Sequence, residues 1–214
     1  MTQKELYNAV IDWFEATMPN PQTELHYRNP YELLVAVILS AQCTDARVNI
    51  VTPPLFEAYP TPHSLAQATV EEIFGYIKSV TFPNNKARSL KGAATTLVEK
   101  FDGQVPDDID SLTAIPGVGR KTANVMLSVV FGKAAMAVDT HVFRVSERIG
   151  LTKGSRNPAQ TEQTLTRHIP SSKLSRAHHW LILHGRYVCK ARRPLCLECG
   201  LKAVCAHYNK TTEP

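Results

Sequence analysis

Residues 110–131 read DSLTAIPGVGRKTANVMLSVVF and contain two helical patterns joined by a short turn. The first pattern lies near Asp110–Ala114, and the second runs over Arg120–Phe131. The turn between them includes Gly117-Val118-Gly119, and glycine permits tight backbone turns that other residues resist. This stretch therefore predicts a hairpin of two helices that is closed by glycine.

The rest of the chain also has helical periodicity. Leu6, Val10 and Phe14 fall on one face of a first helix, because their spacing of four residues matches the helical repeat. Asn29-Pro30 is typical of a helix start, and the apolar run that follows it predicts a buried central helix. Alternation typical of strands is not convincing anywhere, so we expect an all-α fold. Further helices are predicted for Thr69–Ile77, Ala87–Phe101, Thr140–Ile149, Pro158–His168 and Lys173–Val188.

Composition limits the class of protein. The chain has 214 residues, 43% of them hydrophobic and 20% charged, which is ordinary for one large or two small globular domains. Its longest purely apolar run, Leu33–Leu39, is far shorter than the roughly 18 residues of a membrane-spanning helix. Glu5 and Asp12 interrupt any secretory signal at the N-terminus. We therefore expect a cytoplasmic protein with no membrane partner.

Positive charge is concentrated near the C-terminus. The chain carries 24 Lys and Arg against 19 Asp and Glu, a net charge of +5. Six of these cations and only two carboxylates lie from Arg186 onward, which favours a polyanionic partner for this region. A solvated charged surface is the alternative. The cations are Arg186, Lys190, Arg192, Arg193, Lys202 and Lys210.

The glycine hairpin is a candidate phosphate site. Uncovered N–H groups at a helix N-terminus bind phosphate because their unsatisfied donors and the helix dipole both favour an anion. Such a site would hold DNA without recognising its sequence. Many helical hairpins use glycine for steric reasons alone, so the motif by itself leaves that alternative open. The candidate DNA contacts are Gly117, Val118, Gly119 and Arg120.

Lys121 and Asp139 are the candidate catalytic pair. Lys121 lies in the first turn of the second hairpin helix, where the helix dipole and Arg120 both favour a neutral, nucleophilic amine. Asp139 follows an apolar stretch eighteen residues later and precedes a predicted helix. The alternatives are a lysine that is merely solvated or contacts phosphate, and an aspartate that only caps a helix.

Four cysteines form a compact group with the spacing C-x6-C-x2-C-x5-C. Four thiolates this close can ligate one metal centre, whereas two disulfides would be unusual in a cytoplasmic chain. Only the central pair has the short spacing common in zinc sites, so spacing alone leaves zinc and an iron–sulfur cluster about equally favoured. The four are Cys189, Cys196, Cys199 and Cys205.

Several separated motifs resemble the endonuclease III family of bifunctional DNA glycosylases within the helix-hairpin-helix superfamily. The likeness covers essentially the whole chain. Besides the cysteine spacing, the motifs are SAQCTD (40–45), IPGVGRKTAN (115–124), AVDTHVFR (137–144) and HHWLILHGRY (178–187). The resemblance implies a six-helix barrel domain at 22–133 and a [4Fe-4S] cluster domain made of 1–21 and 134–214, with the active site in a cleft between them.

The resemblance also implies roles for residues. Lys121 and Asp139 match the catalytic lysine and aspartate, and the four cysteines match the cluster ligands. Gln42 matches a residue that enters the space left by an extruded base, and Phe82 occupies the position of an apolar wedge. The implied activity is base-excision repair of oxidised pyrimidines in double-stranded DNA, with cleavage of abasic sites. We expect a monomer associated with the nucleoid.

The chain departs from the family at Thr81-Phe82-Pro83, where the usual tripeptide resembles Gly-Leu-Tyr, so the wedge loop is expected to have a different shape. Two other functions fit parts of the pattern. Monofunctional adenine glycosylases share the fold, but carry a catalytic glutamate where this chain has Ala36 and usually lack the lysine at 121. A non-catalytic iron–sulfur protein that senses DNA damage would need only the hairpin and the basic C-terminal region.

Overall fold

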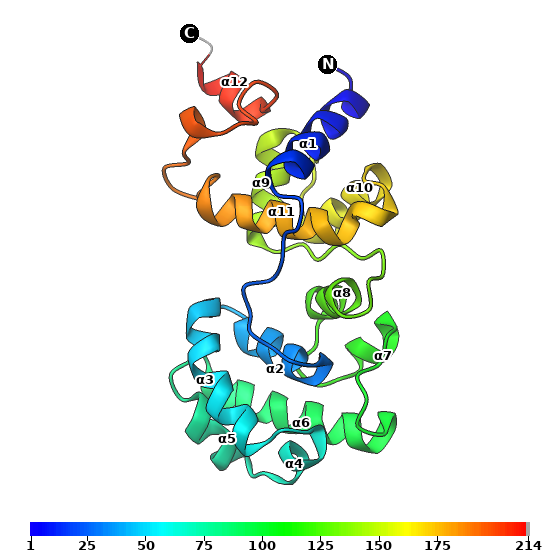
Figure 1. Ribbon diagram of the computed structural model, residues 1–214, viewed down its shortest axis with the longest axis vertical. Helices are drawn as coiled ribbons and strands as arrows, with labels where there is room; N and C mark the ends of the chain where they lie inside the picture. Colours follow the sequence, from blue (N-terminus) through cyan, green and yellow to red (C-terminus); the bar gives the residue numbers. More distant parts are fainter. Residues whose placement is uncertain (213–214) are drawn as a thin grey trace. The chain divides into compact units, whose positions relative to one another are not determined.

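The computed structural model describes residues 1–212, and all of its regular structure in that range is helical (Figure 1). Twelve α-helices and two short 3₁₀-helices follow one another, and no strand is assigned among the described residues. The all-α prediction is confirmed. Ala134–Val138, too short to assign from sequence, forms neither helix nor strand in the described region.

The chain folds into two compact units. We call Thr23–Phe131 the central unit, and Met1–Gln22 together with Gly132–Pro214 the terminal unit. The central unit contains α2 (Pro30–Ser40), α3 (Asp45–Ala58), α4 (Pro62–Gln67), α5 (Val70–Ile77), α6 (Pro83–Phe101), α7 (Ile109–Thr113) and α8 (Arg120–Val129). The terminal unit contains α1 (Gln3–Thr17), α9 (Thr140–Ile149), α10 (Pro158–His168), η1 (Ser171–Lys173), α11 (Leu174–Tyr187), η2 (Cys196–Glu198) and α12 (Ala206–Thr212).

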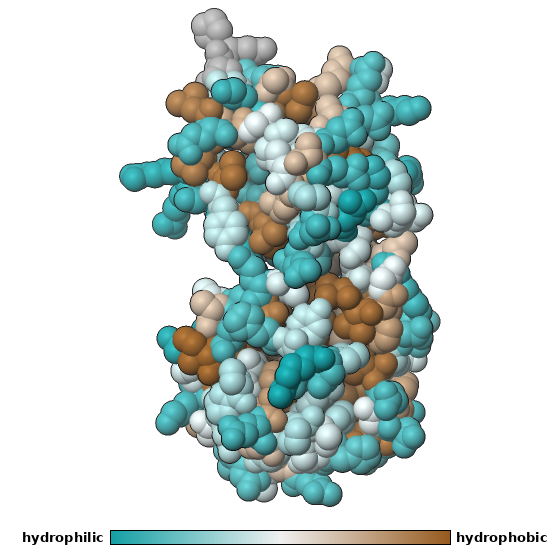
Figure 2. Space-filling view, in the orientation of Figure 1, coloured by the Kyte–Doolittle hydropathy of each residue, from teal (hydrophilic) through white to brown (hydrophobic). Residues whose placement is uncertain are grey.

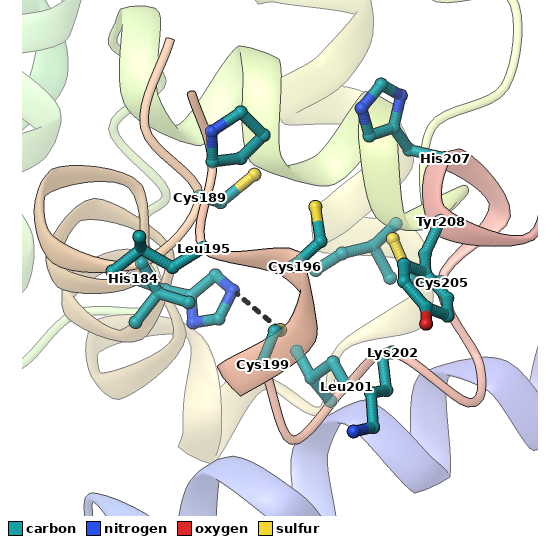
Figure 3. A pocket seen from close by; sticks show the side chains of 13 residues that line it. His184, Cys189, Leu195, Cys196, Cys199, Leu201, Lys202, Cys205, His207 and Tyr208 are labelled. Carbon is teal, nitrogen blue, oxygen red and sulfur yellow. Dashed lines mark hydrogen bonds between the residues drawn. The ribbon is translucent and has the colours of Figure 1, made fainter. Parts of the chain in front are cut away.

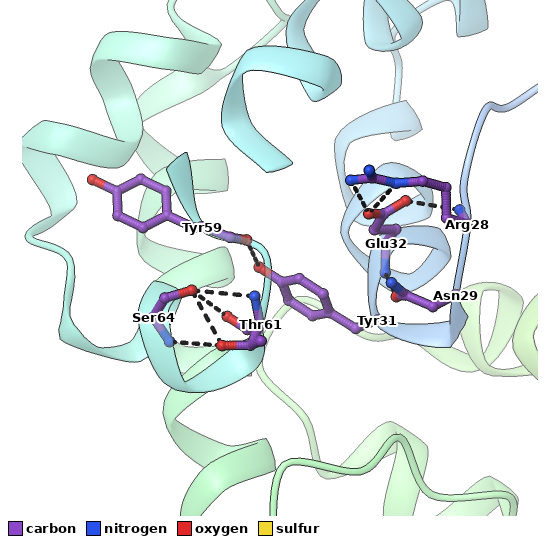
Figure 4. Close-up of polar contacts among 7 residues, drawn as sticks. All are labelled: Arg28, Asn29, Tyr31, Glu32, Tyr59, Thr61 and Ser64. Carbon is purple, nitrogen blue, oxygen red and sulfur yellow. Dashed lines mark hydrogen bonds and ion pairs between the residues drawn. The ribbon is translucent and has the colours of Figure 1, made fainter. Parts of the chain in front are cut away.

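Helix α2 is the buried centre of the central unit, as the sequence predicts. The Asn29 side chain caps it by accepting a hydrogen bond from the Glu32 N–H at 2.9 Å, and Pro30 occupies its first turn. Every residue from Tyr31 to Leu39 is buried, because α3, α6 and α8 all pack against this helix. The buried Glu32 carboxylate is satisfied by Arg28, which donates from its backbone N–H and its guanidinium (Figure 4).

Capping side chains also fix the short helices of this unit. Thr61 and Ser64 exchange hydrogen bonds at the start of α4, and Tyr31 donates to the Tyr59 carbonyl at 3.0 Å just before it (Figure 4). Helix α5 begins with a capping box of Thr69 and Glu72. Both devices satisfy N–H groups that have no partner within the helix, so each helix begins at a defined residue.

Helix α6 begins earlier than predicted. Its apolar stripe starts at Ala87, whereas the helix starts at Pro83, whose fixed φ suits a first helical position. The preceding residue, Phe82, has left-handed φ and ψ angles of 54° and 51° and makes no side-chain cap. The helix ends at Phe101, and its C-cap Asp102 is also left-handed.

Helix α1 completes the core of the terminal unit. Its residues Leu6, Val10 and Phe14 belong to one buried cluster with residues of α9 and α11. The Phe14 ring stacks on Trp180 of α11 with centroids 5.6 Å apart, and the Trp180 indole donates to the Met18 carbonyl at 2.7 Å. The first helix of the chain is therefore held by residues more than a hundred positions later.

Among residues 1–212, no helix combines the length and the apolar composition needed to cross a lipid bilayer. Figure 2 shows hydrophilic side chains interspersed with separate apolar patches over the visible face.

Candidate functional site

The predicted glycine hairpin lies between α7 and α8, which pack against each other. Gly117 has a φ of +82°, and a Cβ at this position would lie 2.7 Å from the Ser89 Cβ, so only glycine fits. Val118 is buried and its N–H donates to the Ile115 carbonyl at 3.0 Å. The expected donor at Val118 is therefore already used inside the turn, which leaves the glycines and the start of α8 as the candidate contacts.

Helix α8 begins at this turn. Its N-cap is Gly119, which provides no side-chain hydrogen bond to the first turn. Arg120 and Lys121 are exposed in that turn, next to the positive end of the helix dipole. The structure therefore places the candidate nucleophile on the surface of the central unit, beside the candidate phosphate site.

Asp139 caps α9 in the terminal unit. Its Oδ1 accepts hydrogen bonds from the N–H groups of His141 and Val142, each at 2.8 Å. Its other carboxylate oxygen accepts no hydrogen bond from any residue that the structure describes, and the side chain is half-buried. The cap thus fixes the direction of the carboxylate through one oxygen, so capping and catalysis are compatible in one side chain.

The segment before Asp139 is anchored from α11. The His178 ring, which is buried, hydrogen-bonds through Nδ1 to the Ala137 carbonyl at 2.8 Å. Residues Ala135–Val138 are buried as well. The segment before Asp139 is thereby held at a fixed place, and it positions the carboxylate that follows.

Gln42 and Phe82 both lie in the left-handed region, each with a φ of 54°. Both side chains are exposed, Phe82 to 56%. A non-glycine residue in this conformation costs roughly 1–2 kcal/mol, so surrounding contacts must hold it there. The Thr81 hydroxyl donates to the Gln42 carbonyl at 2.8 Å, which makes the two loops neighbours.

The four cysteines line one pocket of the terminal unit (Figure 3). The pocket contains about 360 Å³ of space free of protein atoms, including open solvent. All four thiols are half-buried and none forms a disulfide. The Cys199 sulfur lies 3.6 Å from the His184 Nε2. The four predicted ligands therefore lie together, and no disulfide joins any two of them.

The thiols lie close enough to affect one another electrostatically. Burial raises the pKa of Cys196, and the neighbouring Cys189 and Cys205 raise it further. Burial likewise raises the pKa of Cys199, with the other three cysteines adding to the effect. A cationic metal centre would offset this repulsion between thiolates. Among residues 1–212, no three Cys, His, Asp or Glu side chains are arranged to hold a single metal ion.

Two arginines of α9 hold the loop that follows α11 and begins near Cys189. Arg148 donates to the carbonyls of Lys190 and Ala191 at 2.8 and 3.0 Å, and its Nη1 lies 3.5 Å from the Cys189 sulfur. Arg144 donates to the Cys189 carbonyl at 3.2 Å. Sequence reasoning missed both residues. Their spacing of four places them on one helix face, but their partners lie more than forty residues away.

Four of the predicted basic residues lie in or next to this loop, residues 188–195 between α11 and η2, which we call the basic loop. Lys190, Arg192 and Arg193 are exposed, and Arg186 at the end of α11 is half-buried. Arg193 has a left-handed φ of 53°. The same loop therefore carries the first cysteine of the pocket and three exposed cations.

Comparison with known proteins finds a family that covers both candidate catalytic residues. Residues 35–171 match the HhH-GPD superfamily base excision DNA repair protein family. The chain belongs to the HhH-GPD superfamily. The matched HhH-GPD region contains the hairpin, Lys121 and Asp139, whereas the four cysteines follow it.

Similar HhH-GPD proteins match nearly the full chain. Endonuclease III of Rickettsia conorii (strain ATCC VR-613 / Malish 7) is 48% identical over 206 residues, which cover 96% of this chain and 98% of that protein. Endonuclease III of Escherichia coli (strain K12) is 44% identical and covers 90% of both chains. A solved structure of a trapped endonuclease III–DNA covalent intermediate, an estranged-adenine complex, covers 100% of both chains with a TM-score of 0.94 and 45% identity. The resemblance to endonuclease III that the sequence predicts is confirmed.

Proposed function

We propose that the protein repairs oxidised pyrimidines in double-stranded DNA, as a glycosylase that also cleaves abasic sites. One observation carries this proposal: full-length similarity to an endonuclease III that was trapped in a covalent intermediate with DNA. A covalent intermediate requires a nucleophile. We assign that role to Lys121, the exposed lysine of the hairpin.

The proposed reaction starts with extrusion of the damaged nucleotide, which costs least for a base that stacks or pairs poorly. The Lys121 amine then forms a bond to the sugar C1′ while the glycosidic bond breaks and the base leaves with the electron pair. Asp139 stabilises positive charge on the sugar or accepts a proton. Cleavage of the C1′–O4′ bond then opens the sugar ring, a proton passes from the amine nitrogen to O4′, and an imine forms between Lys121 and C1′. The imine acidifies the C2′ proton, and loss of this proton expels the 3′ phosphate and nicks the strand.

Borohydride trapping tests the nucleophile. Reduction during turnover on a thymine-glycol duplex should join the protein covalently to DNA, and Lys121→Gln should abolish the adduct. Lys100→Gln, a change of an exposed lysine in the last turn of α6, is the control and should trap like the wild type. An undiminished adduct in Lys121→Gln would refute the assignment.

Strand nicking separates the proposed enzyme from the non-catalytic alternative. In EDTA, the wild-type protein should nick the thymine-glycol duplex, whereas a damage-sensing protein would retard the duplex in a gel and leave it intact.

The residue at position 36 disfavours the adenine-excising alternative. Ala36 is completely buried in the centre of α2, where that class carries a catalytic glutamate.

The proposed DNA-binding surface consists of the hairpin and the basic loop. Gly117, Gly119 and Arg120 would bind phosphates at the start of α8, where the dipole favours anions. Arg186, Lys190, Arg192 and Arg193 would supply further phosphate contacts. Such contacts position a duplex and carry no base information, so selectivity must come from extrusion and from Gln42 and Phe82. We propose that the protein acts as a monomer.

A [4Fe-4S] cluster is the group that we propose for the cysteine pocket. Cys189, Cys196, Cys199 and Cys205 would hold it. The donor set fits, since four thiols share one pocket and none of them is consumed by a disulfide. When bound, the cluster would supply a rigid crosslink between α11 and the basic loop. A broad visible absorption band in the purified protein would support iron–sulfur, whereas a colourless protein containing zinc would contradict it.

A further inference from the structure

Two exposed loops of the central unit each contain one residue in the left-handed conformation. The first is Ala41–Thr44, which follows α2 and contains Gln42. The second is Lys78–Phe82, which precedes α6 and ends with Phe82. We call them the paired loops. Neither residue is a glycine, so neither conformation is favoured by the local sequence.

Two side chains tie the paired loops together. The Thr81 hydroxyl donates to the Gln42 carbonyl at 2.8 Å. The Lys86 ammonium donates to the carbonyls of Leu39 and Ala41 at 2.7 and 2.8 Å. The Lys86 backbone N–H also bonds to the Phe82 carbonyl at 3.1 Å. One residue of α6 therefore contacts the backbone on both sides of the pair.

The position of Lys86 has a clear physical reason. Its side chain is only 6% exposed, and burial of an ammonium is costly unless hydrogen bonds compensate for lost water. Its partners are the last carbonyls of α2, which have no partner within the helix and lie at the negative end of its dipole. The lysine thus stabilises the end of α2 and fixes where the Gln42 loop begins.

We infer that Thr81 and Lys86 are positioning residues that present Gln42 and Phe82 to DNA as one preformed unit. This inference rests on the proposed function, in which those two side chains enter the duplex. A preformed loop pair avoids the ordering cost that flexible loops pay on binding. The Thr81 hydroxyl supplies the hydrogen bond to the Gln42 carbonyl, at a position where the endonuclease III family usually has glycine.

Threonine variants test the hydroxyl tie. Thr81→Val removes the hydroxyl and keeps the shape, whereas Thr81→Ser keeps the hydroxyl. Binding to a duplex with a stable abasic-site analogue should weaken roughly threefold to tenfold in Thr81→Val, the range for loss of one neutral hydrogen bond. Thr81→Ser should bind like the wild type, and undamaged duplex should bind equally to all three. Thr164→Val, which loses a hydroxyl bond to the Gln160 carbonyl on α10, is the matched control and should change neither duplex.

A double-mutant comparison tests whether the tie acts through the presented side chains. In a Gln42→Ala/Phe82→Ala background, Thr81→Val should change binding less than about twofold, because the groups that it positions are gone. An equal loss in both backgrounds would overturn the inference. Lys86→Met should cause a larger loss of abasic-site binding than Thr81→Val, and thermal unfolding of this variant shows whether it folds.

The outcomes separate this inference from the proposed function. If the wild-type protein binds abasic-site and undamaged duplexes equally, the proposed DNA role of the paired loops fails. If the wild-type protein discriminates and Thr81→Val discriminates just as well, the proposed function stands and the positioning role of Thr81 is refuted.

Discussion

Gly200 is the residue whose substitution the structure constrains most tightly. Gly200 lies in the loop after η2, and a Cβ at this position would clash with the Trp13 indole of α1. Gly200→Ala should therefore force the loop or the indole to move, and should lower the free energy of unfolding by about 1–3 kcal/mol. Denaturant unfolding measures the change.

Gly75 provides the matched control for that prediction. It lies within α5, and no atom would come within 4 Å of an added Cβ. Gly75→Ala should leave stability unchanged or raise it by up to about 1 kcal/mol, because alanine favours the helix. Equal destabilisation by both alanine variants would show that the contact with Trp13 is not the cause.

The buried His179 predicts a dependence of stability on pH. Burial on α11 lowers its pKa from the ordinary value, and nearby Arg186 lowers it further. The unfolded chain therefore takes up the proton first, so the free energy of unfolding should fall as the pH drops below about 6.5, by up to about 1.4 kcal/mol per pH unit. His179→Gln should flatten this slope in urea titrations at several pH values. The exposed His26→Gln should keep the wild-type slope.

At single residues, the sequence is most informative where a motif is local. The helix start at Asn29-Pro30 and the glycine turn at 117 are both confirmed, because each depends on neighbours within a few positions. The ties made by Thr81 and Arg148 could not be predicted. Their acceptors lie 39 and more than 40 residues away, and only the fold brings them together.

At the scale of elements, α2 supports the loop that carries Gln42, so its start can be tested. Asn29→Ala removes the hydrogen bond to the Glu32 N–H and should lower the free energy of unfolding by about 1 kcal/mol. Asn29→Ser retains a capping oxygen and should lose at most a few tenths of that amount. An equal loss in both variants, measured by denaturant unfolding, would contradict a capping role.

Helix α3 shows why some elements escape prediction. It contains Pro53 and Pro54, which normally end a helix because proline lacks an N–H and clashes with the preceding turn. The helix nevertheless continues to Ala58, and the Thr52 hydroxyl gives the Val48 carbonyl a hydrogen bond just before the prolines. Packing against α2 and α5 outweighs the low helix propensity of the two prolines. A short stretch of sequence does not reveal such packing.

For the whole molecule, the proposed DNA interface predicts a strong dependence on salt. Each phosphate contact adds about −0.9 to the slope of log K against log salt concentration. Arg192→Ala should therefore make the slope shallower by about that amount and weaken damaged and undamaged duplexes alike, since phosphate carries no base information. Titrations by fluorescence anisotropy at several salt concentrations measure both effects. A slope near zero in the wild type would exclude the basic loop as a contact surface.

The division of the chain into units was not readable from composition. No Gly/Ser-rich linker marks the junctions near residues 22 and 132 in the sequence. The boundaries expected in the sequence came from the family resemblance alone. Helix periodicity locates helices, but it does not state that α1 packs with α9 and α11.

That packing has a consequence for biosynthesis. Trp180 and Met18, which bond to each other, are 162 positions apart, so α1 leaves the ribosome long before its partners are translated. At a translation rate of roughly 5–20 residues per second, Trp180 is synthesised about 8–32 seconds after Met18. During this time the apolar face of Leu6, Val10 and Phe14 lacks its packing partners from α11. The nascent chain should therefore bind a chaperone through its first helix during this interval.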